Sequence, residues 1–314
     1  MKHLLFAFAM LIGSISVSAQ DRYFDERYIS SLSFLNPILI NPGATGKDAG
    51  HHLLLNYRNQ WSTFEGSPKS IILSYDGPVA DRLGFGALLL TDSNGELETT
   101  KLQGSLSYTI DSPKNKIGGG IAAEYIKHGL SNDALNNNII NSNDPIVRDR
   151  LAGTSYFEVS LGVYGVYNGN LTYGLAFPSL VSSSVEESNS TISREIGYIF
   201  NLGYRFDQSD SDVVFEPSIM VKKFNHVPFH ADINLLGRFL ENKLRGGITY
   251  RLGADEKIGF LVGTMIGNLN FTYSYNASRH EFQTYNNGSH ELSVRFDIGS
   301  KKVEGVDHEE VMNN

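Results

Sequence analysis

Side chains able to serve as a nucleophile or a base are scattered through this sequence. Serines are abundant, but the histidines beyond the first strand lie on separate segments: His128, His226, His230, His280 and His290. Nucleophilic catalysis needs a nucleophile, a base and an orienting group close together. Ser293 and His290 are near in sequence, yet the two faces of a strand alternate with every residue and separate them. We therefore predict no catalytic residues, and a lipid-modifying enzyme is kept only as an alternative.

Metal sites are equally poorly supported by residue type and spacing. The pair His51-His52 opens a strand-like segment, where adjacent side chains point to opposite faces. The stretch Ser131–Asp149 is dense in Asn and Asp, whose oxygens suit Ca²⁺, but its spacing fits no EF-hand, and a polar surface loop is the alternative. The chain contains no Cys, which excludes disulfides and thiolate ligands. We predict neither a metal nor a cofactor.

Alternating hydrophobicity dominates the chain between residues 51 and 299. In Leu102–Ile110 the large apolar side chains fall on one face, and Gln, Ser and Thr fall on the other. We count about fourteen such segments, beginning near residues 51, 69, 83, 100, 116, 155, 171, 195, 213, 229, 243, 258, 269 and 289. No later stretch reaches the roughly 20 apolar residues of a membrane-spanning helix. Segments of about ten alternating residues in an even number are typical of an outer-membrane barrel.

The connections between these segments favour a barrel over a soluble β-sandwich. Long connections, at residues 129–152, 179–194 and 276–288, follow odd-numbered segments. The tightest, at residues 168–170, 241–242 and 267–268, follow even-numbered ones. Outer-membrane barrels place long loops outside and short turns in the periplasm, whereas a sandwich has no reason to sort its loops. We predict an all-β fold, a transmembrane antiparallel up-and-down β-barrel of about 14 strands.

The polar face and the strand ends agree with this fold. A small soluble core would not hold many ions, but a wet or mutually paired lumen can. We expect the following charged residues to face the lumen at mid-strand: Glu124, Glu158, Arg205, Asp232, Arg238, Arg245, Arg251 and Arg295. Aromatic residues recur near strand ends, as an interfacial girdle requires, for example Tyr57, Trp61 and Tyr108.

The two ends of the chain differ from the barrel region. Lys2, an apolar stretch from Leu4 to Val17 and the small residues Val17-Ser18-Ala19 predict a signal peptide cleaved after Ala19. We therefore divide the chain into a signal peptide (1–19), an N-terminal segment (20–50), the barrel (51–299) and a polar tail (300–314). A net charge of −8 argues against nucleic acid as a partner. Export and a barrel together predict the outer membrane, with its lipid as one partner.

Residues 20–50 contain a stretch compatible with a helix around Glu26–Leu35 and then two Asn-Pro pairs. Pro37 and Pro42 fix φ and push the preceding Asn away from helix, so we expect an ordered, extended entry into the first strand. With about fourteen strands the lumen is wide enough for a plug. We expect residues 20–50 to cover or enter the periplasmic mouth, with Arg58 or Gln60 helping to hold them. Alternatively, Arg58 is an ordinary lumen charge and Trp61 an ordinary girdle residue.

Two motifs in this region resemble a known family. Asn36-Pro37-Ile38-Leu39-Ile40-Asn41-Pro42-Gly43-Ala44-Thr45-Gly46 is followed by Tyr57-Arg58-Asn59-Gln60-Trp61 and by Gly66-Ser67-Pro68-Lys69. In this order and spacing the motifs resemble the PorP/SprF family of type IX secretion membrane proteins. The family motif residues, with a structural or docking role, are then Asn36, Pro37, Asn41, Pro42, Gly43, Tyr57, Arg58, Asn59, Gln60, Trp61, Gly66, Pro68 and Lys69.

The resemblance implies a function that periodicity alone does not. It implies an outer-membrane barrel of the type IX secretion and gliding motility machinery, acting as an anchor or docking platform for secreted or surface proteins. The implied partners are a periplasmic peptidoglycan-binding lipoprotein of the secretion ring and a secreted adhesin or cargo protein. The alternatives are a porin-like channel for small solutes and the lipid-modifying enzyme considered above.

Overall fold

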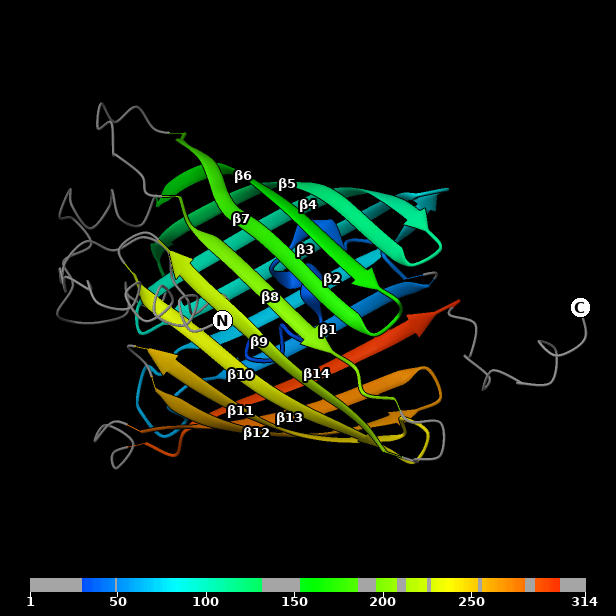
Figure 1. Ribbon diagram of the computed structural model, residues 1–314. Helices are drawn as coiled ribbons and strands as arrows, with labels where there is room; N and C mark the ends of the chain where they lie inside the picture. The colour runs from blue at the N-terminus through cyan, green and yellow to red at the C-terminus, as the bar shows by residue number, and fades with distance from the viewer. Residues whose placement is uncertain are drawn as a thin grey trace, which may run out of the picture.

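Fourteen antiparallel strands close into a β-barrel in the described part of the chain (Figure 1). The computed structural model describes residues 30–48, 50–131, 153–185, 196–207, 213–224, 227–253, 256–279 and 286–299. The strands are β1 (His51–Asn59), β2 (Lys69–Ala80), β3 (Leu83–Asn94), β4 (Leu97–Ser112), β5 (Asn115–Leu130), β6 (Thr154–Tyr167), β7 (Leu171–Ser184), β8 (Tyr198–Tyr204), β9 (Val214–Phe224), β10 (Val227–Phe239), β11 (Leu244–Gly253), β12 (Lys257–Ile266), β13 (Leu269–Ser278) and β14 (Ser289–Ile298). The predicted barrel is confirmed, and the β-sandwich is wrong.

Each strand pairs with its neighbours in sequence, and the first strand pairs with the last. His51 lies opposite Ile298 and Asn59 opposite His290, so β1 and β14 close the sheet along the full length of β1. Because a closed sheet has no free edge, each strand has a hydrogen-bonded neighbour on both sides, as a lipid environment demands. Among the described residues, no helix is long and apolar enough to cross a membrane.

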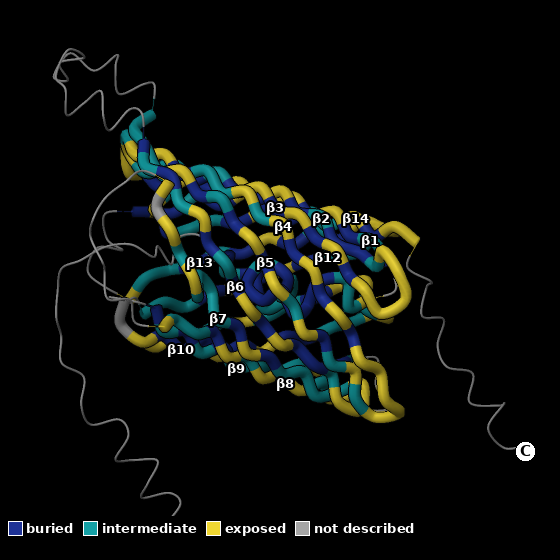
Figure 2. Tube along the Cα trace, turned by 90° about the horizontal axis from the view of Figure 1, so that it is seen from above, coloured by how far each residue is buried: buried dark blue, intermediate teal, exposed yellow. Residues whose placement is uncertain are grey.

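Burial alternates along the strands, as Figure 2 shows by colour. On β1 the side chains of Leu53, Leu55 and Tyr57 are exposed on the outer face, while Asn56 and Arg58 are buried on the inner face. The alternation that predicted each strand therefore separates an apolar exterior, which faces lipid, from a polar interior. This is the reverse of a soluble protein, where exposed apolar patches are small.

The connections distinguish the two ends of the barrel, called here the loop end and the turn end. At the turn end, strands join through residues 81–82, 113–114, 168–170, 240–243 and 267–268. At the loop end, the loops predicted after β5, β7 and β13 begin later than expected, because these strands continue to Leu130, Ser184 and Ser278. The two-residue turn Gly95–Glu96 also lies at the loop end. The sorting of loop lengths is therefore less complete than the sequence indicated.

Residues 30–48, called here the luminal segment, precede β1. Residues 31–35 form turns, so the described part of the helix expected around Glu26–Leu35 is not helical, and residues 26–29 lie outside the described residues. Two single-turn 3₁₀ helices follow, η2 (Pro37–Leu39) and η3 (Pro42–Ala44). The expectation of an extended entry is wrong, because each Pro occupies the first position of a turn and not a position in an extended run.

Candidate functional site in the barrel lumen

The luminal segment lies inside the barrel, where Figure 1 shows it in dark blue behind β8 and β9. Its first residues, Ser30 and Ser31, contact Glu291, which is near the loop-end start of β14. Its last residue, Asp48, contacts His52 at the turn-end start of β1. The segment thus runs along the lumen and does not merely cover its turn-end mouth.

Asn41 and the Pro-Gly pair after it fix the central part of the segment to the wall. The Asn41 side chain donates to the carbonyl of Val163 on β6 at 2.9 Å and accepts from the amide of Gly43 at 2.9 Å. The second bond caps η3, as expected for an Asn before a turn. Asn41 is 1 % exposed, and both the nitrogen and the oxygen of its side-chain amide are hydrogen-bonded, as expected for a buried polar group.

Glycines on the inner wall allow the backbone of the segment to touch the backbone of the barrel. A Cβ on Gly43 would lie 2.8 Å from the carbonyl oxygens of Gly118 and Gly162. Conversely, a Cβ on Gly118 would overlap the carbonyl oxygen of Gly43, and a Cβ on Gly120 would overlap that of Pro42. These contacts involve backbone atoms that cannot rotate away. The glycines therefore form a track shaped to receive residues 41–43.

The next residues of the segment bind the adjacent part of the wall, on β4 and β2. The Thr45 hydroxyl lies 3.0 Å from that of Ser105, and its carbonyl accepts from the Ser107 hydroxyl, both on β4. The amide of Gly46 donates to the carboxylate of Asp76 on β2 at 3.1 Å. Thr45 is fully buried. This part of the segment is thus clamped between β2 and β4.

Glu291 on β14 holds the start of the segment. Its carboxylate accepts from the hydroxyls of Ser30 and Ser31, from the amide of Ser31 at 3.0 Å and from the Asn56 side chain at 2.8 Å. Arg58, which the sequence proposed as a holder, is the strand partner of Glu291 and is also buried on the inner face. Glu291 therefore binds the segment at this level, and the part proposed for Arg58 stays a prediction.

Apolar side chains of the segment fill the rest of the space. Ile40 packs with Ala176, Ile199, Met220 and Phe224 on β7 to β9, and Leu32 packs with Leu236 and Leu261 on β10 and β12. Leu39 packs against Ile72, Leu88 and Leu90 on β2 and β3. The segment thereby contacts strands on every side of the barrel. Together the three clusters make a small hydrophobic core inside an otherwise polar lumen.

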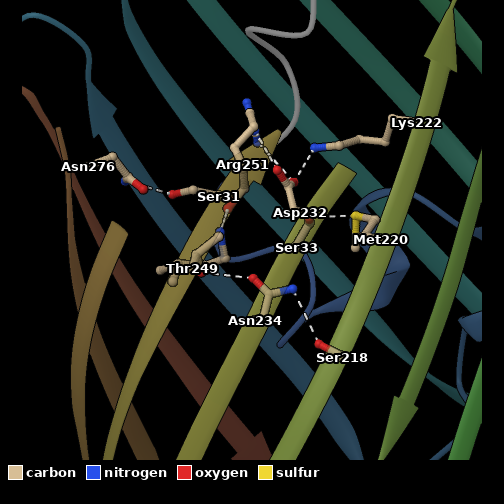
Figure 3. A network of polar contacts seen from close by, with 12 residues as sticks. Ser31, Ser33, Ser218, Met220, Lys222, Asp232, Asn234, Thr249, Arg251 and Asn276 are labelled. Atoms are coloured by element: carbon tan, nitrogen blue, oxygen red, sulfur yellow. Dashed lines mark hydrogen bonds and ion pairs between the residues drawn. The ribbon is translucent and has the colours of Figure 1, made fainter. Parts of the chain in front are cut away.

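Charged residues in the loop-end half of the lumen are paired, as Figure 3 shows for β9 to β11. Asp232 accepts from Lys222 at 2.6 Å and from Arg251 at 2.5 Å, and all three residues are buried. The predicted paired lumen is therefore present here. The same view shows Ser33 of the luminal segment beside Met220. The prediction of a mid-strand position is wrong for three arginines, because β8 ends before Arg205, Arg238 is the next-to-last residue of β10 and Arg245 is the second residue of β11.

Ion pairs fasten the turn-end part of the segment. Asp48 lies 2.9 Å from the Lys47 ammonium and 3.6 Å from the ring of His52. Burial by itself would raise the pKa of Asp48, but the hydrogen bond from His52 and the Lys47 charge hold that pKa well below its usual value. Burial would lower the pKa of Lys47, yet Asp48 raises it above its usual value. Both groups are therefore ionised at neutral pH.

The second group of motif residues lies at the loop end, away from the first. Tyr57 is on the outer face, Arg58 is on the inner face, and Asn59 accepts from the Ser67 hydroxyl at 3.1 Å. The backbone amide of Gln60 donates to the carbonyl of Pro68 at 2.9 Å. Trp61 and Gly66 have positive φ values of 54° and 71°, and Lys69 begins β2. These residues build the β1–β2 loop, whereas Asn36, Pro37, Asn41, Pro42 and Gly43 lie in the lumen.

The residues first considered for chemistry do not converge in the described part of the chain. His290 lies on the outer face beside Tyr273 and Tyr275, while Ser293 is buried on the inner face. His51 contacts Tyr75, and His52 faces inward toward Asp297. Among the described residues no cluster of metal-ligating side chains forms. His226, His280 and all but Ser131 of the Asn/Asp-rich stretch lie outside the described residues.

Comparison with known proteins decides the family. A family model described as type IX secretion system membrane protein PorP/SprF matches residues 22–296. The chain belongs to this family. The resemblance read from the Asn-Pro and Tyr-Arg-Asn-Gln-Trp motifs is thereby confirmed. The chain is a β-barrel of the PorP/SprF family of type IX secretion system membrane proteins.

Solved structures similar to this PorP/SprF chain include an outer membrane protein, a hydrocarbon channel and a toluene transporter, all of low sequence identity. Omp33 of Acinetobacter baumannii is 6% identical, with 81% of this chain and 99% of that chain covered and a TM-score of 0.45. The monoaromatic hydrocarbon channel CymD is 12% identical, with 86% and 92% covered and a TM-score of 0.48. The toluene transporter TbuX of Ralstonia pickettii is 8% identical, with 86% and 94% covered and a TM-score of 0.48. At such identities the likeness concerns the fold alone. No curated protein matches the chain.

Sequence reasoning missed the wall residues that receive the luminal segment. The run Gly118-Gly119-Gly120 inside a strand was the available indication, because glycine in a strand interior often marks the close approach of another backbone. Gly162 on the neighbouring β6 belongs to the same track, and Gly84 on β3 makes room for the carbonyl of Thr45 in the same way. No comparable pattern points to Glu291, since isolated acidic residues occur on many lumen-facing positions.

Proposed function

We propose that this PorP/SprF protein is a closed outer-membrane platform of the type IX secretion and gliding machinery that anchors or docks secreted or surface proteins. The observation that carries the proposal is the occupied lumen. The luminal segment is bonded to β14 through Glu291, to β6 through Val163 and to β4 through Ser105. A pore for small solutes would need these contacts broken. We further propose that a signal peptide is removed after Ala19.

The porin-like alternative requires an open lumen instead of an occupied one. A porin keeps an aqueous path open, so its lumen is lined by hydrated charges. Here Ile40, Leu32 and Leu39 bury apolar surface against the wall. Exposing this apolar surface to water again would cost free energy. The packing favours a barrel that is closed at rest, and steady conductance of the full-length protein would favour the porin.

The proposed partners follow from the family: a periplasmic peptidoglycan-binding lipoprotein and a secreted adhesin or cargo protein. A hollow of about 440 Å³ at the turn end offers a place for the periplasmic one. It is lined by Lys47 and Asp48 of the luminal segment and by Lys114 and Lys116 of the β4–β5 hairpin. A partner bound there would touch the segment and the barrel together.

The test is affinity purification of the tagged full-length barrel from outer membranes, followed by mass spectrometry. We expect the peptidoglycan-binding lipoprotein or a large adhesin to be enriched over an unrelated barrel with the same tag. The double variant Lys114→Glu with Lys116→Glu should reduce recovery of the periplasmic lipoprotein. Lys127→Glu, an exposed residue near the loop end of β5, is the matched control and should not.

Enrichment of neither partner, from membranes in which the barrel is folded, would contradict the docking role. Equal loss of the lipoprotein in the Lys127→Glu control would show that the effect is one of net charge and not of the turn-end hollow. A lipid-hydrolysing activity of the purified barrel would instead support the enzymatic alternative.

A further inference from the structure

Arginines gather on the inner face of the barrel toward the turn end, along β8 to β14. Arg205 follows β8, Arg238 lies on β10, Arg245 on β11 and Arg295 on β14. Near them the described residues supply two strand carboxylates, Glu216 on β9 and Asp297 on β14, and Asp207 after β8, which pairs with Arg205 at 3.2 Å. This wall therefore carries more positive than negative charge, unlike the paired cluster around Asp232 deeper in the lumen.

The two carboxylates are already committed. Glu216 accepts both Nε and Nη2 of Arg238, each at 3.0 Å, which is the bidentate geometry of a strong pair. Asp297 lies 2.8 Å from Nε of Arg295 and 2.7 Å from the ring of His52, and it also accepts from Asn270 at 2.6 Å. Neither carboxylate makes a hydrogen bond with Arg245 in the described structure.

Among the described arginines of this wall, Arg245 is the one that makes no ion pair with a carboxylate, whereas Arg205, Arg238 and Arg295 each make one. It donates to the neutral Asn270 side chain at 2.5 Å, while its Nε is buried and has no hydrogen-bond partner among the described residues. Only 8% of Arg245 is exposed. A buried guanidinium with an unused donor and no bonded acid is costly, since charge taken out of water needs a hydrogen-bonded counter-charge.

The placement of Arg245 increases this cost. It lies directly opposite Arg238 in the β10–β11 register, and like charges in such positions destabilise a sheet. Gly263 on β12 leaves a slot for the side chain, because a Cβ there would lie 2.9 Å from Cγ of Arg245. The wall is thus shaped to hold a cation that it does not neutralise.

We propose that Arg245, together with Arg238, binds a single oxyanion, a phosphate or a carboxylate group, that enters the lumen from the turn end. A guanidinium fork matches the oxygens of either group and gains most where both are withdrawn from water. The oxyanion accepts from the free Nε of Arg245 and separates the two facing arginines. This site does not depend on the docking role proposed above.

The test uses the full-length barrel in detergent, titrated calorimetrically at constant ionic strength with inorganic phosphate and, separately, with acetate. We expect one anion per barrel. Arg245→Gln should weaken binding about tenfold or more, the equivalent of one lost charge-assisted hydrogen bond. Arg82→Gln removes an arginine of the β2–β3 turn at the same end that is half exposed, and it should leave binding unchanged. Binding of phosphate alone, acetate alone or both identifies the ligand group.

Absence of saturable binding of either anion, or equal binding by the wild-type and Arg245→Gln barrels, would overturn the proposal. Should Arg245→Gln not fold, Arg245→Lys replaces it, because lysine keeps the charge but lacks the planar fork. Phosphate should then raise the thermal unfolding midpoint of the wild type more than that of Arg245→Lys. An equal rise in the two proteins would also overturn the proposal.

Discussion

Adding one methyl group to the inner wall should push the luminal segment out of its track. Gly118 and Gly120 of β5 face inward, and a Cβ on either would overlap backbone of residues 42–43. β5 is paired over its whole length with β4 and β6, so the wall cannot yield easily. The segment has fewer backbone bonds and is expected to move instead. Gly118→Ala and Gly120→Ala therefore test whether the packed position of the segment is its preferred state.

The size of the effect follows from the cost of overpacking. Forcing an extra methyl group into a well-packed interior costs about 1–3 kcal/mol. If that cost falls on the docked state, the population of the released segment rises about 5- to 160-fold. Gly119→Ala adds the same methyl group to the same strand but on the outer face, where no atom lies within 4 Å. This control should change the population by less than about 0.5 kcal/mol, or roughly twofold.

The absence of cysteine from the chain supplies a direct assay. Thr45→Cys places a single thiol in the segment at a position with 0% exposure. Its rate of modification by a water-soluble maleimide reports how often the segment leaves the wall. We expect faster modification in the Gly118→Ala and Gly120→Ala backgrounds than in Gly119→Ala. Equal rates in all three would refute the argument from close packing.

Three further outcomes are expected. Glu291→Ala removes the acceptor of several hydrogen bonds from the start of the segment, so limited proteolysis there should quicken about tenfold or more; an unchanged rate would contradict this anchor. Asp232→Ala leaves two buried cations without their shared carboxylate, so the urea stability of the folded band should fall by about 3–5 kcal/mol, and a loss below about 1 kcal/mol would count against the cluster. Because the pKa of Asp48 is depressed, the contribution of Asp48 to stability is fully present above about pH 4 and is lost at lower pH. The protection of the Thr45→Cys thiol, relative to a free thiol at the same pH, should therefore be constant between about pH 5 and 8. Loss of protection within that range would argue against this ion pair.

The barrel was predictable because apolar and polar residues alternate within each strand and so indicate its two faces. Alternation such as that in Leu102–Ile110 is a local property, and lipid outside and water inside impose it on every strand. The expected starts agree with the observed starts within three residues, from His51 to Ser289. Strand ends were less predictable. β5 and β7 extend into stretches whose polar composition resembled loops, because strands protruding from a membrane no longer need an apolar face.

The luminal segment was predictable in its presence but not in its path. Two Asn-Pro pairs indicate turns or extended chain, and Asn41 does cap the turn that follows it. Which wall residues receive the segment depends on contacts between positions far apart in sequence, such as Ser31 with Glu291. Strand periodicity carries no information about such pairs. The glycines Gly118 and Gly120 were the only local trace of this packing.

The family motif residues remain a prediction as docking determinants. The structure separates them into a luminal group around Asn41 and a loop-end group around Trp61, and these two groups lie in different parts of the barrel. Their closeness in sequence therefore reflects the short first strand between them. A single docking surface made by all of them is not compatible with this separation.

The central claim is that residues of the luminal segment close the barrel, and single-channel conductance in a planar bilayer tests it most directly. The full-length protein should be closed, while a variant lacking residues 20–46, shown to be folded by its heat-dependent gel shift, should conduct small ions steadily. Steady conductance of the full-length barrel, or a folded deletion variant as closed as the full-length protein, would contradict the account.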